Sequence, residues 1–177
     1  YVYLWRGWPR RALGEFRISQ AIEPETLSSR LGEIQAYRDR NDFSAAARGI
    51  DGVLKSNPDN AETDKLRGSW DIHSMRELWV QASGTYSNGS QIGSRDLDLD
   101  TYLYSQPLRI RYRVFGHSYL SQSTFPEGKG IYRRLGAGLE YRARDLELSG
   151  ELSDGPARDQ GLGLSLRGLW MFDDHWR

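Results

Sequence analysis

Cysteine is absent from this 177-residue chain, and so are several other features that mark common classes of protein. Without cysteine the chain forms no disulfide framework, no catalytic thiolate and no zinc–cysteine site. Lysine plus arginine total 24, as do aspartate plus glutamate, so the net charge gives no sign of a nucleic-acid partner. No apolar run approaches the ~20 residues that a membrane-spanning helix needs.

Recognisable catalytic motifs are also missing from the sequence. The three histidines, His73, His117 and His175, lie far apart without the spacing of metal ligands. There is no nucleophile elbow, P-loop or HExxH motif. Asp98 and Asp100 could mimic a carboxylate pair, but as neighbours on an open strand they lack the environment that a general acid needs. We therefore predict that the chain is not an enzyme and holds no cofactor or metal, with a glycosidase as the enzymatic alternative.

The first 68 residues have helical periodicity and repeat themselves after 34 positions. Small residues recur where helices would cross, and proline recurs where the second helix of each unit would end. This period and pattern are typical of tetratricopeptide repeats, the alternative being a helical hairpin duplicated by chance. The matched pairs are Tyr3 and Tyr37, Ala12 and Ala46, Phe16 and Ile50, and Pro24 and Pro58.

Amphipathic patterning divides this part into helices with short polar turns between them. The expected helices cover residues 10–22, 27–38, 43–55 and roughly 61–66, the last with Asn60 or Asp59 as its cap. Because such units need stacked neighbours, one and a half repeats imply more of them upstream.

From about Met75 the hydrophobic period changes to two, the period of a β-strand. The segment RDLDLDTYLYS (95–105) is the clearest case, because Asp96, Asp98 and Asp100 alternate with leucines. A strand points successive side chains to opposite faces, so this one has an acidic face and an apolar face. Six strands are predicted, at residues 77–87, 95–105, 108–120, 131–143, 146–153 and 161–172.

The apolar face is expected to meet lipid, although the strands of a soluble β-sandwich would alternate in the same way. The predicted strands are about ten to twelve residues long, against about 5–6 in an average globular protein. Tilted strands of ~9–11 residues cross a bilayer. Tyr112, Tyr141, Trp170 and Phe172 lie toward strand ends on the apolar face, like an aromatic girdle.

The connections indicate the same architecture. The segments SQP (105–107) and RD (144–145) are short, whereas 87–94, 121–130 and 153–160 are longer, glycine-rich and polar. Short turns at one end and long loops at the other are typical of outer-membrane barrels. Both short turns fall at the end where the first strand begins, so the helical repeats should lie on the short-turn, periplasmic side.

We therefore predict an α+β protein in two parts. Residues 1–68 would be the C-terminal part of a periplasmic tetratricopeptide-repeat domain, 69–76 a linker, and 77–177 the N-terminal strands of an antiparallel outer-membrane β-barrel. Six strands cannot close such a barrel, because bacterial examples have at least about eight. Both ends are accordingly expected to be cut from a longer polypeptide. This interpretation would be contradicted if Leu97, Leu99 and Leu103 were buried under helices or a second sheet.

The polar face is expected to line an aqueous passage and to serve as a track for a sugar polymer, the alternative being a solvated wall that only stiffens the barrel. Aromatic faces stack on pyranose rings and acids attract amino groups, and the attraction must be weak and repeated for the polymer to keep moving. The candidate lumen residues are Trp79, Asp96, Asp98, Asp100, Tyr102, Tyr104, Arg109, Arg111, Arg113, Phe115, Glu140, Glu147 and Glu151.

A specific strand register follows if Gln106 and Pro107 form a two-residue turn. The opposed pairs would then be Tyr104 with Arg109, Tyr102 with Arg111, Asp100 with Arg113 and, across the Arg144–Asp145 corner, Arg142 with Glu147. In that register the three arginines would locally neutralise the acids of the adjacent strand.

The segments RDLDLDTYLYSQPL (95–108), EGKGIYRRLGAGLEYRARDLELSGELS (127–153) and MFDDHWR (171–177) resemble the barrel of PgaA/HmsH-type porins. RGWPRRALGEFRISQAIEPE (6–25) resembles the last repeats of that family's periplasmic domain. The likeness covers most of the chain, and the order of the segments also agrees.

The resemblance implies a Gram-negative outer-membrane protein whose sixteen-stranded barrel exports poly-β-1,6-N-acetyl-D-glucosamine for the biofilm matrix. It also implies that the periplasmic repeats engage a partner deacetylase and the partially de-N-acetylated, cationic polymer, which an acidic lumen at Asp96, Asp98 and Asp100 would favour. The expected partners are this polymer, the deacetylase and outer-membrane lipid. A porin for cellulose or another polysaccharide, and an assembly scaffold without transport, are the alternatives.

Overall fold

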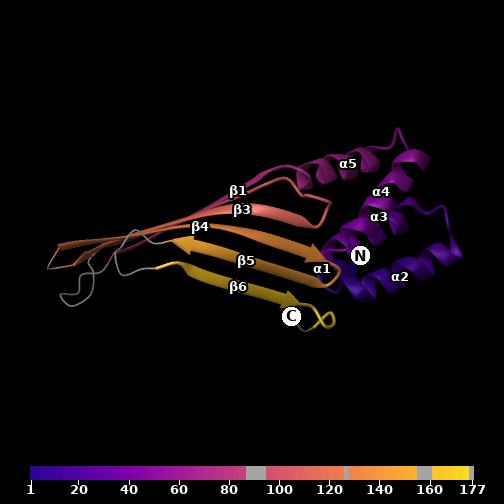
Figure 1. The fold of residues 1–177 in the computed structure, drawn as a ribbon. Helices are drawn as coiled ribbons and strands as arrows, with labels where there is room; N and C mark the ends of the chain where they lie inside the picture. Colours follow the sequence, from indigo (N-terminus) through magenta and orange to yellow (C-terminus); the bar gives the residue numbers. More distant parts are fainter. Residues whose placement is uncertain (87–94, 126–127, 155–160, 176–177) are drawn as a thin grey trace.

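The computed structural model describes residues 1–86, 95–125, 128–154 and 161–175. Within these residues a group of five helices is followed by one six-stranded sheet (Figure 1). The helices are α1 (Val2–Trp5), α2 (Pro9–Ile22), α3 (Leu27–Asp39), α4 (Phe43–Ser56) and α5 (Ala61–His73). The strands are β1 (Glu77–Tyr86), β2 (Arg95–Tyr104), β3 (Tyr112–Phe125), β4 (Gly128–Ala143), β5 (Leu146–Asp154) and β6 (Gly163–Trp170). The change of period near Met75 therefore marks the change from helix to strand.

Successive helices pack against one another, α2 on α3, α3 on α4 and α4 on α5. Their buried core consists of Ile34, Ala46, Ile50 and Val53. The side chain of Asp42 accepts a hydrogen bond from the amide of Ala45, and that of Asn60 accepts one from the amide of Glu62, which fixes the starts of α4 and α5. The bounds of α2, α3 and α4 agree with the sequence-based expectations to within a residue.

α5 is longer than expected and occupies much of the segment assigned to a linker. It continues to His73, because Leu66 and Trp70, one helical turn apart, both pack against the helical core. The polar composition of this segment conceals that spacing. The tetratricopeptide identity of the helices and the domain boundaries stay predictions.

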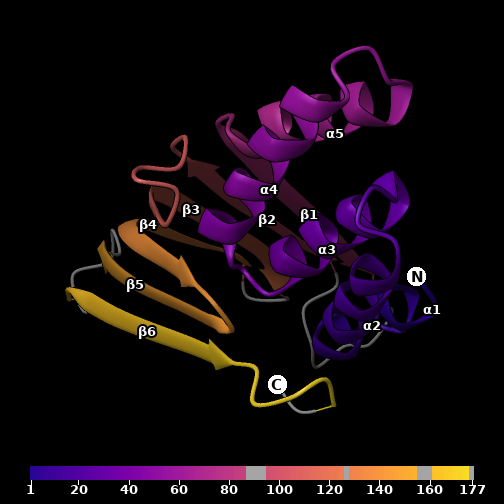
Figure 2. The ribbon, with the colours of Figure 1, turned by 90° about the vertical axis from the view of Figure 1, so that its right-hand side faces the viewer.

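The six strands pair in sequence order as an antiparallel up-and-down sheet. The helices lie at one end of the sheet, beside the β4–β5 turn (Figure 1), and the end-on view shows that the sheet is curved (Figure 2). Among the described residues, no helix has the length and apolar character that crossing a bilayer would require.

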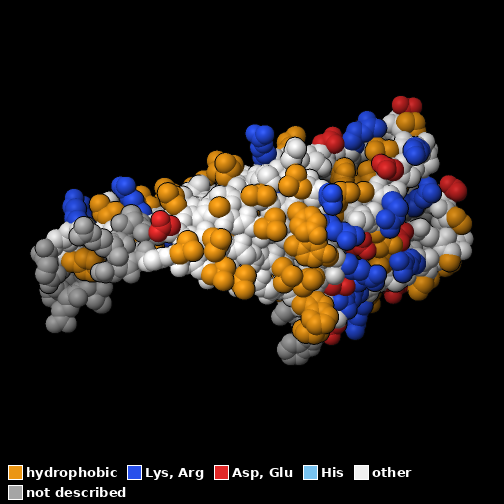
Figure 3. Space-filling view, in the orientation of Figure 1, with side chains coloured by type: hydrophobic (Ala, Val, Ile, Leu, Met, Phe, Trp, Pro, Cys, Tyr) orange, Lys and Arg blue, Asp and Glu red, His pale blue; other side chains and the backbone are white. Residues whose placement is uncertain are grey.

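The alternation of faces predicted for the strands is confirmed. Leu97 and Leu103 are 53% and 55% exposed, and no helix or second sheet formed by the described residues covers them. Apolar side chains gather over the sheet on the face shown in Figure 3, whereas charged side chains gather over the helical end. The outward leucines therefore form a continuous apolar surface, and exposing such a surface to water is unfavourable.

The predicted register between β2 and β3 is wrong. Ser105 does not pair with Leu108, because the chain makes a wider turn in which Arg109 and Ile110 adopt positive φ angles of 50° and 68°. The amide of Ser105 instead donates to the carbonyl of Val114, at 2.8 Å. The observed pairs are Tyr104 with Phe115, Tyr102 with His117 and Asp100 with Tyr119. By contrast, the predicted pair Arg142 with Glu147 is present between β4 and β5.

The predicted long connection at 121–130 is also wrong, because most of it is strand. β3 extends to Phe125 and β4 begins at Gly128, and these two residues are paired. Ser123 and Thr124 continue the ladder, because they pair with Gly130 and Lys129 of β4. The connection at 87–94 and most of that at 153–160 lie outside the described residues.

Replacing Gly32 tests the close packing of α2 on α3. A Cβ atom at Gly32 would overlap the ring of Phe16, so Gly32→Ala should destabilise the helical part by about 1–3 kcal/mol. Gly52→Ala in α4 is the matched control, because a Cβ atom there meets nothing within 4 Å and should stabilise by up to about 1 kcal/mol. Thermal unfolding followed by helical circular dichroism measures both, and equal effects would contradict the packing.

Candidate functional site: the inner face of the sheet

The face of the sheet opposite the leucines carries most of the predicted lumen residues. Register and alternation place the following on this inner face: Trp79, Asp96, Asp98, Asp100, Tyr102, Tyr104, Arg113, Phe115, Glu140, Glu147 and Glu151. Arg109 and Arg111 do not join them, because they lie in the turn before β3. The guanidinium of Arg111 instead donates to Ser44 Oγ of α4, at 3.3 Å.

An aromatic cluster spans β1, β2 and β3 on the inner face. The ring centroid of Tyr102 lies 5.7 Å from that of Trp79, 5.9 Å from that of Tyr104 and 5.8 Å from that of Phe115. A Cβ atom at Gly138 on β4 would overlap the Phe115 ring, so this glycine makes room for the cluster. Phe115 is buried beneath the cluster, whereas the rings of Trp79, Tyr102 and Tyr104 remain accessible to a ligand on the inner face.

His117 connects three strands through its two ring nitrogens. Nε2 lies 2.8 Å from Oδ1 of Asp100 on β2, and Nδ1 lies 2.8 Å from Oε1 of Glu151 on β5. The Tyr102 ring stacks on the imidazole with centroids 4.1 Å apart and an interplanar angle of 7°. Sequence reasoning dismissed His117 because it looked for metal-ligand spacing, although its phase with Phe115 and Tyr119 placed it on the polar face.

The inner-face charges nearest the helices pair with one another rather than with the aspartates of β2. Arg113 Nη1 lies 2.7 Å from Oε2 of Glu77, and Arg142 Nε lies 2.8 Å from Oε1 of Glu140. Glu147 lies 4.0 Å from Arg142. The expectation that arginines 109, 111 and 113 neutralise the acids of β2 is therefore wrong, because the true register separates the two groups.

Two adjoining polar hollows lie on the inner face, with volumes of about 130 and 310 Å³. Both are lined by Tyr102, Tyr104, Arg142 and Arg167, while Glu151 lines the first and Trp79 and Asp100 line the second. Rings and charged groups on one open wall can stack on sugar rings and hold their polar substituents. Within the described part of the chain, no group of histidine and carboxylate side chains is arranged to hold a metal ion.

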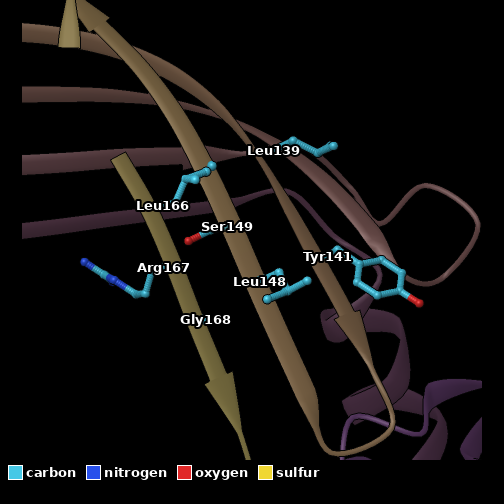
Figure 4. A pocket seen from close by; sticks show the side chains of 8 residues that line it. Leu139, Tyr141, Leu148, Ser149, Leu166, Arg167 and Gly168 are labelled. Carbon is cyan, nitrogen blue, oxygen red and sulfur yellow. The ribbon is translucent and has the colours of Figure 1, made fainter. Parts of the chain in front are cut away.

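The outer face of the same strands has a different chemistry. Leu139, Tyr141, Leu148 and Leu166 line a shallow hollow of about 480 Å³, whereas the side chain of Arg167 points away from them (Figure 4). Paired aromatic rings lie on this face near the helices, Tyr112 with Tyr141 at 5.0 Å and Trp170 with Phe172 at 4.4 Å. Leucines bordered by aromatic rings match the lipid-facing surface of a transmembrane barrel.

Comparison with known proteins agrees with a membrane β-barrel in the strand-forming part of the chain. The profile of the PgaA membrane β-barrel domain matches residues 72–177, which include all six strands. The poly-β-1,6-N-acetyl-D-glucosamine export proteins of Escherichia coli K12 and O157:H7 are each 31% identical over 174 residues. These alignments cover 97% of this chain and 22% of each relative, so the chain spans only a minor part of their length. No solved structure gives a match.

Replacing His117 tests whether it joins the strands. His117→Phe keeps a ring against Tyr102 but leaves Asp100 and Glu151 unpartnered, which should destabilise the sheet by about 1–3 kcal/mol. Adding Asp100→Asn and Glu151→Gln to His117→Phe should recover most of that loss, because no unpaired carboxylate remains. Thermal unfolding of the complete protein in detergent measures the cycle, and a simple sum of destabilising effects would refute the bridge.

Proposed function

The chain belongs to the PgaA membrane β-barrel family, and from this membership we propose that it forms part of an outer-membrane pore that exports a biofilm exopolysaccharide. The cargo would be poly-β-1,6-N-acetyl-D-glucosamine, the polymer named for its relatives, and we propose that it passes in a partially de-N-acetylated form. The observation that carries the proposal is the two-faced sheet, with leucines on one side and rings and carboxylates on the other. Passage through the pore requires no covalent step, so the protein would act without catalysis.

Aromatic rings would provide the sliding surface for the polymer. Trp79 and Tyr104 each lie within 6 Å of the Tyr102 ring centre, so a pyranose leaving one ring meets the next, while the buried Phe115 supports the rings from beneath. Successive weak contacts hold the polymer without fixing it, because no single position binds much more tightly than its neighbours.

The aspartates of β2 would select for amino groups on the polymer. Asp98 accepts a hydrogen bond from the Tyr119 hydroxyl, at 3.1 Å, and Asp100 is bridged to His117, while no arginine stands opposite either. Asp100 shares its hollow with Arg142 and Arg167, so Asp98 would be the more effective of the two in attracting a cationic sugar unit, which is the product of de-N-acetylation. This arrangement supports a track of acidic side chains for a cationic polymer, here called the charge track, more than the predicted register did.

The helices would face the periplasm and receive the polymer there. They lie at the end of the sheet that carries the 105–111 and 144–145 connections (Figure 1). The short 144–145 turn is of the kind that faces the periplasm in outer-membrane barrels, whereas the wider 105–111 connection does not contribute to this orientation. We further propose that the helices are tetratricopeptide repeats of a periplasmic domain that docks a deacetylase. The strands would belong to a closed, sixteen-stranded barrel.

Two alternatives make different predictions for the complete protein. An assembly scaffold with a plugged barrel should give no large conductance in a planar bilayer, whereas an exporter should give one. A porin for cellulose or another neutral polysaccharide should conduct but should not depend on the aspartates of the inner face.

Neutralising the aspartates of β2 tests the charge track. The triple variant Asp96→Asn, Asp98→Asn and Asp100→Asn in the complete protein should reduce secretion of amino-bearing polymer severalfold, because the wall loses its attraction for ammonium groups. The matched control replaces the same three residues by glutamate, which keeps the charge and should preserve secretion. Secreted polymer is measured at equal outer-membrane protein levels, and unchanged secretion by the asparagine variant would refute the track.

A further inference from the structure

The turn between β4 and β5 is attached to the helices by a buried ion pair. Asp145 accepts hydrogen bonds from Nε and Nη2 of Arg40, at 2.9 and 2.6 Å, and its amide donates to the Arg40 carbonyl, at 2.7 Å. Arg10 of α2 approaches the same carboxylate to 3.1 Å. Arg40 is 5% exposed and lies 105 positions away in the sequence, so tertiary structure alone creates this contact.

Asp145 is ionised in this setting. Burial alone would raise the pKa of its carboxyl, but hydrogen bonds from Arg40 and the charges of Arg40, Arg10 and Arg144 hold that pKa below its ordinary value. A two-pronged arginine–carboxylate contact also fixes direction, because both hydrogen bonds must align at once.

The segment after β6 provides a second attachment, to the start of α2. Oδ1 and Oδ2 of Asp174 accept hydrogen bonds from the backbone amides of Arg10 and Arg11, at 2.9 and 2.8 Å. Trp8, the residue at the N-cap of α2, gives no side-chain hydrogen bond, so this distant carboxylate satisfies the free amides of the first turn. The Arg10 guanidinium also donates to the carbonyls of Met171 and Phe172.

A third attachment joins α5 and β3. Arg113 Nη2 donates to the carbonyl of His73, the last residue of α5, at 2.8 Å, while Nη1 of the same guanidinium binds Glu77. Burial and the charge of Arg113 lower the pKa of His73 to about 4, so its ring is neutral at pH 7. It packs as an aromatic group between Phe43 and Trp70.

We propose that these three attachments hold the helices on the mouth of the barrel as one rigid body, with Asp145 as the main positioning residue. Three contact points that do not lie on one line remove every rotation of one body against another. The attachments lie on β3, on the β4–β5 turn and after β6, and the curvature of the sheet keeps them off a single line (Figure 2). If residues 74–76 were the only connection, the helices could change their angle relative to the sheet.

Distances between spin labels in the complete protein in detergent test this docking. Lys55→Cys on α4 and Leu103→Cys on β2 are both exposed sites, and the present chain adds no native cysteine. The otherwise unchanged protein should give one narrow distance distribution. Asp145→Asn should widen it at least about twofold, because Arg40 loses its charged partner.

Three further variants make the result specific to the junction. Glu147→Gln, two residues from Asp145, removes an acid that contacts Arg142 and not the helices, and should leave the distribution narrow. Asp145→Glu keeps the charge with altered geometry and should give an intermediate width. If Asp145→Asn fails to assemble, Asp174→Asn, at a half-buried site, should widen the distribution in its place.

Equal widths for the unchanged protein and for the aspartate variants, or a broad distribution in the unchanged protein, would overturn the proposal. The measurement involves no transport, so failure of the rigid docking is distinguishable from failure of the proposed export.

Discussion

The strict alternation of side chains along each strand is the constraint on which the rest of this structure depends. It places the exposed leucines on one face and most of the polar and charged side chains on the other. A one-residue slip in any strand would exchange the two faces. A sheet with these two surfaces suits a boundary between hydrocarbon and water, which is why membership of a membrane β-barrel family agrees with the structure.

The inner face gains its chemistry from the pairing of strands rather than from any local motif. Asp100, His117 and Glu151 are spread over 51 positions of sequence, yet register brings both carboxylates within 2.8 Å of the imidazole. The same register moves Arg109 and Arg111 off the wall and leaves the aspartates of β2 opposite serine and tyrosine. This sector of the inner face is therefore less neutralised by arginine than the predicted register implied.

The helices and the sheet are joined by charged contacts at the end of the sheet. Asp145 and Asp174 lie in connections that read as ordinary polar loops, but each accepts two hydrogen bonds from the helices. Buried ionic contacts demand precise geometry, so they determine orientation more than they add stability. In an exporter, such a junction would keep the helical surface in line with the aromatic entrance of the lumen.

The sequence by itself determined the two-part architecture, the approximate bounds of α2 to α4, the six strands and the face that each strand residue occupies. It could do so because hydrophobic period is a local property, read from neighbours a few positions apart. Tertiary structure decided the β2–β3 register, the contacts of His117, the full length of α5 and the attachment of the helices to the end of the sheet. Each of these depends on turn conformation or on contacts between distant residues, such as the positive φ angles at Arg109 and Ile110, which no local periodicity encodes.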